Sequence, residues 1–392
     1  MRRDGVYPMK FEFTTAGRIV FGSGTIKEIP SLAEAFGRKA LLVTGSNFER
    51  VSGLINLLKE KQISPFIFSV SGEPSTEIVT LGTAIAREKK CEFVISAGGG
   101  SVIDTGKAIS AMMTSDGHIL DYLEVIGKGK ALRKIPAPFI AIPTTAGTGS
   151  EVTKNAVLFS QEHKVKVSLR SNLMIPKIAV IDPELTLSLP PSVTATTGLD
   201  ALTQLIEPYV CNSPNPIVDA ICREGIKRVS LSIRKAYSNG DDLSAREDMC
   251  LASLFGGMAL ANAKLGAVHG FAGTLGGMFN APHGAICARL LPAVMKFNAE
   301  ALNDREPSSP VIGRFTEVAQ ILTGNMSATI TEGVDWIYSL CRDFAIPSLS
   351  GYGLKEEHIE SVVKQSEKAS SMKGNPVLLT EHELALILRE VL

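Results

Sequence analysis

The chain contains one carboxylate and two histidines in a pattern that suits a divalent metal ion. Asp200 and Gln204 lie four residues apart in the predicted helix 197–210, so their side chains share one face. His269 and His283 follow in glycine-rich segments that flank predicted helices. Iron and zinc accept carboxylate and imidazole ligands, and either ion can polarise a substrate oxygen as a Lewis acid. From the residues alone, capping or surface roles for the two histidines stay the simpler interpretation.

A first glycine-rich segment suits the phosphates of a dinucleotide. Residues 98–101 (GGGS) follow the predicted strand 92–97 and open a predicted helix. Glycines let backbone N–H groups approach a pyrophosphate closely, and a helix start adds free N–H groups and the positive end of its dipole. The alternative is a tight turn in which Ser101 caps the helix and Asp104 completes a capping box. Both interpretations can hold at once.

A second segment of small residues follows the predicted strand 139–142. Residues 143–153 (PTTAGTGSEVT) are rich in glycine and hydroxyl side chains, which suit close contact with a nicotinamide, ribose or phosphate. Ligands of open parallel sheets bind beyond the carboxyl ends of the strands. We therefore favour a binding loop here over an irregular connection.

The first half of the chain alternates strand and helix patterns, which predicts βαβ units and a parallel sheet. An N-terminal hairpin is expected over residues 11–21. The predicted strands cover 39–44, 65–70, 92–97 and 139–142, and the predicted helices cover 47–61, 76–90 and 102–114.

The second half is predicted to be entirely helical, because helical periodicity replaces strand patterns beyond residue 182. We divide the chain into a Rossmann-like α/β domain, 1–184, and a helical domain, 185–392, at a proline-punctuated junction. The predicted helices are 198–210, 216–237, 245–263, 284–297, 314–322, 331–344 and 382–392.

Composition excludes several classes of protein. Lys plus Arg and Asp plus Glu number 40 each, so the basic excess of a nucleic-acid-binding protein is missing. The apolar runs fall short of the roughly 18–20 residues that span a bilayer. The N-terminus has no apolar stretch typical of a signal peptide. Six scattered cysteines without a CxxC pair indicate free thiols in a reducing compartment. We expect a cytoplasmic enzyme without nucleic-acid or membrane partners.

Several long motifs, in order, resemble the iron-containing (group III) alcohol dehydrogenases. The resemblance covers nearly the whole chain and rests on residues 21–29 (FGSGTIKEI), 98–110 (GGGSVIDTGKAIS), 142–153 (IPTTAGTGSEVT), 197–210 (TGLDALTQLIEPYV), 268–284 (VHGFAGTLGGMFNAPHG) and 372–380 (MKGNPVLLT). It implies the two-domain architecture of dehydroquinate synthase and NAD(P)-dependent interconversion of alcohols with aldehydes or ketones. It also implies a homodimer formed through the N-terminal strands, here residues 10–22.

The resemblance assigns roles to individual residues. Asp200, Gln204, His269 and His283 fall on the four metal-ligand positions, and Asp200, His269 and His283 would carry catalysis. The cofactor-binding positions would be Gly45, Asn47, Gly98, Gly99, Gly100, Ser101, Asp104, Thr144, Thr145, Thr148, Ser150 and Lys166.

Three departures from the family pattern bear on the metal and the cofactor. Gln204 stands where metal-dependent members have histidine, and Gly273 stands where many members have a further histidine. Both changes remove an imidazole, which weakens the predicted Fe²⁺ or Zn²⁺ site. Gly45, followed by Ser46 and Asn47, replaces an aspartate that repels the 2′-phosphate of NADP. NADP should therefore be tolerated, and we favour it slightly over NAD.

The leading hypothesis is a small alcohol or aldehyde substrate, turned over with the help of a retained but weakened metal site. Without metal, protonated His269 or His283 could donate to the carbonyl oxygen. A metal-independent oxo-acid reductase similar to maleylacetate reductase is the close alternative. A lyase resembling dehydroquinate synthase and a non-catalytic binding module are the others.

Overall fold

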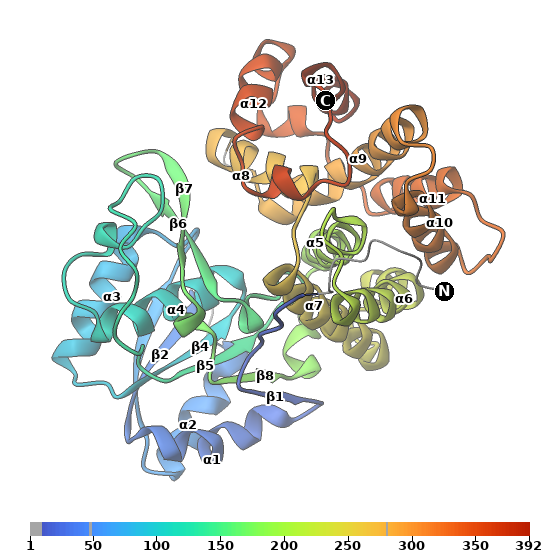
Figure 1. The fold of residues 1–392 in the computed structure, drawn as a ribbon. Coiled ribbons are helices and arrows are strands. Elements are labelled where there is room, and N and C mark those ends of the chain that lie inside the picture. The colour runs from blue at the N-terminus through green and yellow to red at the C-terminus, as the bar shows by residue number, and fades with distance from the viewer. Residues whose placement is uncertain (1–9, 47–48, 280) are drawn as a thin grey trace.

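A parallel sheet forms the N-terminal half of the chain. The computed structural model describes residues 10–46, 49–279 and 281–392 (Figure 1). The six strands are arranged in the order β1-β8-β5-β4-β2-β3, and every neighbouring pair is parallel. They are β1 (Arg18–Phe21), β2 (Lys39–Gly45), β3 (Ser64–Val70), β4 (Phe93–Gly98), β5 (Phe139–Pro143) and β8 (Ile178–Ile181). The predicted Rossmann-like α/β fold is confirmed.

Helices cover both faces of this sheet, which explains why its central strands are almost continuously apolar. All six residues of β4 are buried. Leu41 of β2 packs with the helices α3 (Thr76–Glu88) and α4 (Gly100–Thr114) on one face. Its neighbour Leu42 packs with α1 (Ile29–Ala33) and α2 (Ser52–Glu60) on the other. Successive side chains of a strand point to opposite faces, so a strand covered on both sides needs an apolar residue at every position.

The predicted N-terminal hairpin is wrong. Residues 10–17 form no strand, and β1 pairs in parallel with β8 instead. The preceding segment is tied to a distant helix, because Thr14 donates its N–H to Asn262 Oδ1 and accepts from Asn262 Nδ2 at 2.8 Å. The sequence analysis also missed β8 and an antiparallel hairpin of β6 (Asn155–Ser160) and β7 (Val165–Arg170).

The C-terminal half is helical, as predicted, and its central helix is α5. This helix packs against α6, α7 and α9, and 15 of its 20 residues are buried. The sequence analysis missed α8 and α12. The helices are α5 (Pro191–Val210), α6 (Pro216–Ser238), α7 (Leu243–Asn262), α8 (Ala267–Phe279), α9 (His283–Arg305), α10 (Pro310–Thr323), α11 (Ile330–Asp343), α12 (Ile359–Ser366) and α13 (Glu381–Glu390).

No single helix in the described part of the chain has the length and apolar character to cross a membrane. Helices α7 and α8, bent by 96° at the break between them, meet the two criteria as a pair, by length and composition only.

The loop after β5 joins the sheet to the helical half by direct backbone contact. Gly149 has a left-handed conformation (φ 59°), and its backbone touches Gly257 of α7: a Cβ added at Gly257 would lie 2.3 Å from Gly149 O. A Cβ added at Gly147 would lie 2.6 Å from Thr197 Cβ of α5. This end of the sheet is therefore held against α5 and α7, the first of which carries Asp200.

We predict that Gly257→Ala destabilises the protein by about 1–3 kcal/mol, because a methyl group must displace the Gly149 backbone. Urea unfolding measures the change. The matched control is Gly313→Ala on the exposed surface of α10, where an added Cβ meets no atom within 4 Å. That variant should be neutral, or more stable by up to about 1 kcal/mol. Equal stability of the two variants would refute the close contact.

Candidate active site

Helix α5 carries two buried carboxylates on one face. Asp200 and Glu207 are separated by two helical turns, with Gln204 between them, and all three side chains are buried. Asp200 is 1% exposed, and its Oδ1 atom has no hydrogen-bond partner among the residues that the structure describes. Burying an ionised carboxylate without a partner is costly, so this oxygen marks a position suited to a cation.

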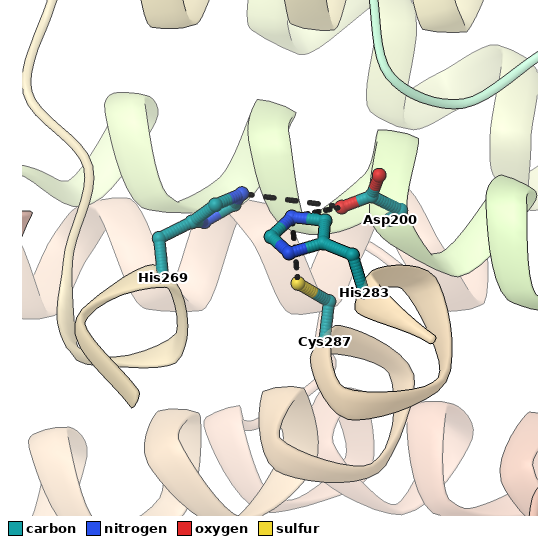
Figure 2. Close-up of side chains that lie close together, drawn as sticks. All are labelled: Asp200, His269, His283 and Cys287. Atoms are coloured by element: carbon teal, nitrogen blue, oxygen red, sulfur yellow. Dashed lines mark hydrogen bonds and ion pairs between the residues drawn. The ribbon is translucent and has the colours of Figure 1, made fainter. Parts of the chain in front are cut away.

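Both predicted histidines reach the unpartnered oxygen of Asp200. The Nε2 atoms of His269, on α8, and His283, at the start of α9, lie 3.9 Å and 3.6 Å from Asp200 Oδ1 (Figure 2). The centroids of their rings are 5.5 Å apart. The structure thus brings together the three residues predicted to carry catalysis.

The sequence analysis missed a fourth member of this cluster. The Sγ atom of Cys287 lies 3.5 Å from His283 Nε2, one turn further along α9 (Figure 2). One ligand-type atom from each of the four residues lies within 4.8 Å of the others. The spacing of four from His283 to Cys287 was the available signal, because residues at i and i+4 share one face of a helix.

Glu207 orients His269 and is a second residue that the sequence analysis missed. Its Oε2 atom lies 2.6 Å from His269 Nδ1, and its Oε1 accepts a hydrogen bond of 2.7 Å from the Val268 N–H. With the Nδ1 proton donated to Glu207, Nε2 is the atom left facing Asp200. A carboxylate behind a histidine in this way fixes the tautomer that ligates a metal.

The pKa values of the ionisable groups in the cluster shift in different directions. Burial alone would lower the pKa of His269, but the charge and hydrogen bond of Glu207 raise that pKa above the usual value. Burial lowers the pKa of His283; the charge of Asp200 opposes this only in part, and that of His269 adds to it. Burial also raises the pKa of the Cys287 thiol well above its usual value. Near neutral pH, His283 therefore offers a neutral imidazole.

A distant segment holds the start of α8 in place. The Ala267 N–H donates to Asn375 Oδ1 at 3.1 Å, and Asn375 Nδ2 donates to Asn298 Oδ1 at 2.6 Å. A Cβ added at Gly270 would lie 2.8 Å from Met372 Cε. Residues 372–380, which the sequence analysis recognised only as a motif, therefore anchor the turn of helix that presents His269.

The two glycine-rich segments meet at the carboxyl ends of adjacent strands. Thr144 N–H donates to Gly98 O at 3.0 Å, and β4 pairs with β5. A Cβ added at Gly99 would lie 3.5 Å from Thr145 Oγ1, and one at Gly100 would lie 2.7 Å from Thr148 Cγ2.

Within the described ranges of the chain, no side chain caps the start of α4, whose N-cap is Gly99. The alternative in which Ser101 caps this helix is therefore wrong. The helix start stays free of a side-chain acceptor, as an anion-binding site requires.

Asp104 and Ser150, both predicted to bind cofactor, brace the second loop against α4. Asp104 accepts hydrogen bonds from Ser150 Oγ and, at 2.9 Å, from the Val157 N–H. Buried Lys107 donates to Ser150 O at 2.8 Å and to Thr153 Oγ1 at 2.9 Å. The described contacts of these residues thus fix the shape of the loop.

The remaining predicted residues lie at separate places. Lys166 of β7 pairs with Glu73 at 3.2 Å, and its Nζ would be 3.5 Å from a Cβ added at Gly276 of α8. Gly45 ends β2, and a Cβ there meets nothing within 4 Å. Asn47 lies outside the described residues.

Gln204 and Gly273, which stand where the resemblance expects histidine, differ in their surroundings. Gln204 Oε1 is buried without a hydrogen-bond partner and would lie 3.3 Å from a Cβ added at Gly256 of α7. A Cβ added at Gly273 meets nothing within 4 Å. The first position is therefore tightly packed and the second is open.

Comparison with known proteins gives one consistent result. Residues 16–183 match the family Iron-containing alcohol dehydrogenase, and residues 194–392 match the Fe-containing alcohol dehydrogenase family, C-terminal. A choline dehydrogenase of Bacillus subtilis is 35% identical over 95% of this chain and 92% of its own. A crystal structure of 1,3-propanediol oxidoreductase aligns with TM-score 0.91 and 33% identity, covering 98% and 100% of the two chains. The sulfoacetaldehyde reductase of Bifidobacterium kashiwanohense, solved with NAD⁺, aligns with TM-score 0.87 and 31% identity over 98% and 99%.

We predict that Glu207→Gln lowers the pKa of His269, because the variant removes the carboxylate charge at Nδ1. In metal-free protein, NMR titration of the imidazoles measures this pKa, with His358 and His382 as internal controls. Because the pKa of His269 is higher in the folded protein than its unfolded value of about 6.5, protonated His269 stabilises the folded state at pH values below 6.5. This stabilisation is lost as the pH rises through the pKa of His269 in the folded state. The variant's deficit in unfolding free energy should therefore be largest in acid. An unchanged His269 pKa would contradict the assigned contact.

Proposed function

The chain belongs to the iron-containing alcohol dehydrogenase family, and from this premise we propose that it interconverts small alcohols and their aldehydes or ketones beside Asp200, His269 and His283. It is an oxidoreductase of CH–OH groups, in line with the named dehydrogenases that it resembles along nearly its full length. The observation that carries the proposal is the convergence of both imidazoles on one buried carboxylate oxygen.

The residues of the cluster fit a divalent ion. The unpartnered Asp200 Oδ1 supplies an anionic ligand, and Nε2 of His269 and of His283 supply imidazole ligands. When bound, the ion polarises a carbonyl oxygen and NAD(P)H supplies the hydride. The complete set of ligands determines whether the site binds iron or zinc.

The chain's own groups bind and orient the reactants. Backbone N–H groups of the uncapped start of α4, beginning at Gly100, bind the pyrophosphate. Thr145 and Thr148, which lie over the glycines of that turn, confine the nicotinamide end of the cofactor. Glu207 keeps the Nδ1 proton of His269 in place, so that Nε2 faces the reacting oxygen. Lys166, from the β6–β7 hairpin, lies beside α8 and pairs with Glu73; there it would contact the nicotinamide ribose, as the family resemblance implies.

We propose NADP(H) as the preferred cofactor, because Gly45 at the end of β2 carries no charge to repel a 2′-phosphate. A Cβ added at Gly45 meets none of the described residues within 4 Å, so larger side chains can be tested there without a clash with that part of the chain.

Gly45→Asp should lower kcat/KM for NADPH by about 10-fold or more relative to NADH, because the new carboxylate repels the 2′-phosphate. Steady-state kinetics with both cofactors measures the ratio. The matched control is Gly45→Asn, which has the same shape without the charge and should leave the ratio near the wild-type value. Equal ratios for both variants, or a wild-type enzyme that rejects NADPH, would refute the preference.

The reaction itself is tested with purified protein, NADPH and a panel of small aldehydes, ketones and oxo-acids. We expect carbonyl-dependent oxidation of NADPH, fastest with uncharged aldehydes. Asp200→Asn is the inactive control. Faster turnover of oxo-acids would favour the maleylacetate reductase-like alternative. NADPH binding without any turnover would favour a non-catalytic role, and phosphate elimination without net NADPH oxidation would favour the lyase.

The assembly and location complete the proposal. We propose a cytoplasmic homodimer. Its support is the place of β1 at the edge of the sheet, where a second copy could add its own strand.

A further inference from the structure

We propose that Cys287 is a metal ligand of this chain, and that Asp200, His269, His283 and Cys287 together bind Zn²⁺ in preference to Fe²⁺. The inference rests on the proposed function only in that both concern the same cluster. It is tested by metal binding rather than by turnover.

The two shortest distances within the cluster are those of a tetrahedral zinc site, and the others require the ligands to contract around the ion. Zn–N bonds of about 2.0–2.1 Å and a Zn–S bond of about 2.3 Å place neighbouring ligand atoms about 3.3–3.6 Å apart. The distance from Cys287 Sγ to His283 Nε2 is 3.5 Å, and that from Asp200 Oδ1 to His283 Nε2 is 3.6 Å. Asp200 Oδ1 and His269 Nε2 are 3.9 Å apart, and all four ligand atoms lie within 4.8 Å of one another.

Rigid elements present all four groups. His283 and Cys287 share one face of α9, and the start of α9 lies so close to α5 that a Cβ added at Gly284 would be 2.7 Å from Thr196 O. Asp200 comes from α5 itself, and Glu207 of the same helix orients His269. A preformed site of this kind binds its ion without further ordering of the chain.

The chemistry of the donors selects the ion. Thiolate is a soft ligand that favours zinc over the harder Fe²⁺, and zinc is commonly bound by mixed sulfur and nitrogen ligands. A carboxylate and a thiolate also balance the charge of Zn²⁺ in a site where Asp200 and Cys287 are fully buried.

With Cys287 as the fourth ligand, the site needs no ligand from α5 other than Asp200. Gln204 stands where the resemblance expects that ligand, and its amide oxygen lies next to Gly256 of α7. A neutral amide is a weak ligand for zinc compared with a thiolate. The ligand lost from α5 is thereby replaced by one from α9.

The experiment compares metal binding by four full-length proteins: wild type, Cys287→Ser, Gln204→Ala and the control Cys341→Ser. Cys341 of α11 is also a buried thiol. Its Sγ donates a hydrogen bond to Ala288 O of α9, the helix that carries Cys287, and a serine hydroxyl can make the same bond. Each protein is stripped with a chelator, checked for native circular dichroism and reloaded with Zn²⁺, Fe²⁺ or Co²⁺. Zinc X-ray absorption, the cobalt spectrum and competition with a chelating dye are the readouts.

We expect wild type, Gln204→Ala and Cys341→Ser to show one sulfur about 2.3 Å from zinc and a near-ultraviolet thiolate-to-cobalt band. Cys287→Ser should lose both signals, and its zinc affinity should fall by more than the roughly 10–100-fold that loss of an outer partner costs. Wild type should also bind Zn²⁺ more tightly than Fe²⁺.

Three results would overturn the proposal: only nitrogen and oxygen neighbours around zinc in wild type, loss of metal from Gln204→Ala but not Cys287→Ser, or no metal binding at all. None of the readouts needs a substrate. An inactive enzyme that still shows the zinc–sulfur bond would refute the proposed reaction and leave the Cys287 assignment intact.

Discussion

The position of the cluster depends on one energetic constraint, the burial of the Asp200 carboxylate in the central helix α5. Its Oδ1 atom has no hydrogen-bond donor, which is unfavourable unless a positive charge lies close by. The surrounding structure directs two imidazoles to this oxygen, where they can hold a cation: Glu207 turns the Nε2 atom of His269 to this side, and α9 brings His283 to within 3.6 Å. Both carboxylates come from the same buried helix, so the packing of α5 sets the geometry of the whole cluster.

Much of the fold could be predicted from local patterns, and the exceptions have physical causes. The central strands β2, β4 and β5 are almost continuous apolar runs, because helices cover both faces of the sheet. Helix α8 was missed since it contains four glycines and has no capping residue nearby in the sequence. Its first N–H groups are satisfied by Asn375 and Glu207, far away along the chain. Local sequence cannot reveal such a helix. The domain boundary after residue 184 stays a prediction.

The candidate site was predictable where residue types repeat a recognisable pattern and unpredictable where they depart from it. Asp200, His269 and His283 lie together as the family resemblance implied. Cys287 was missed because buried cysteines are most often packing residues. Glu207 was missed because its role depends on the approach of α8, which only the tertiary structure shows. A family resemblance predicts the positions that the family shares. It does not predict a replacement such as Cys287, which lies on another helix than Gln204.

The hydrogen bond from Ala267 to Asn375 spans 108 residues and therefore has a consequence for biosynthesis. At translation rates of roughly 5–20 residues per second, the ribosome makes Asn375 about 5–20 s after the segment that will become α8. During this interval the nascent helix lacks an acceptor for its first N–H group, and His269 is not yet held in place. The α/β half can fold while synthesis continues, whereas the ion-binding pocket matures only after Asn375 has been synthesised.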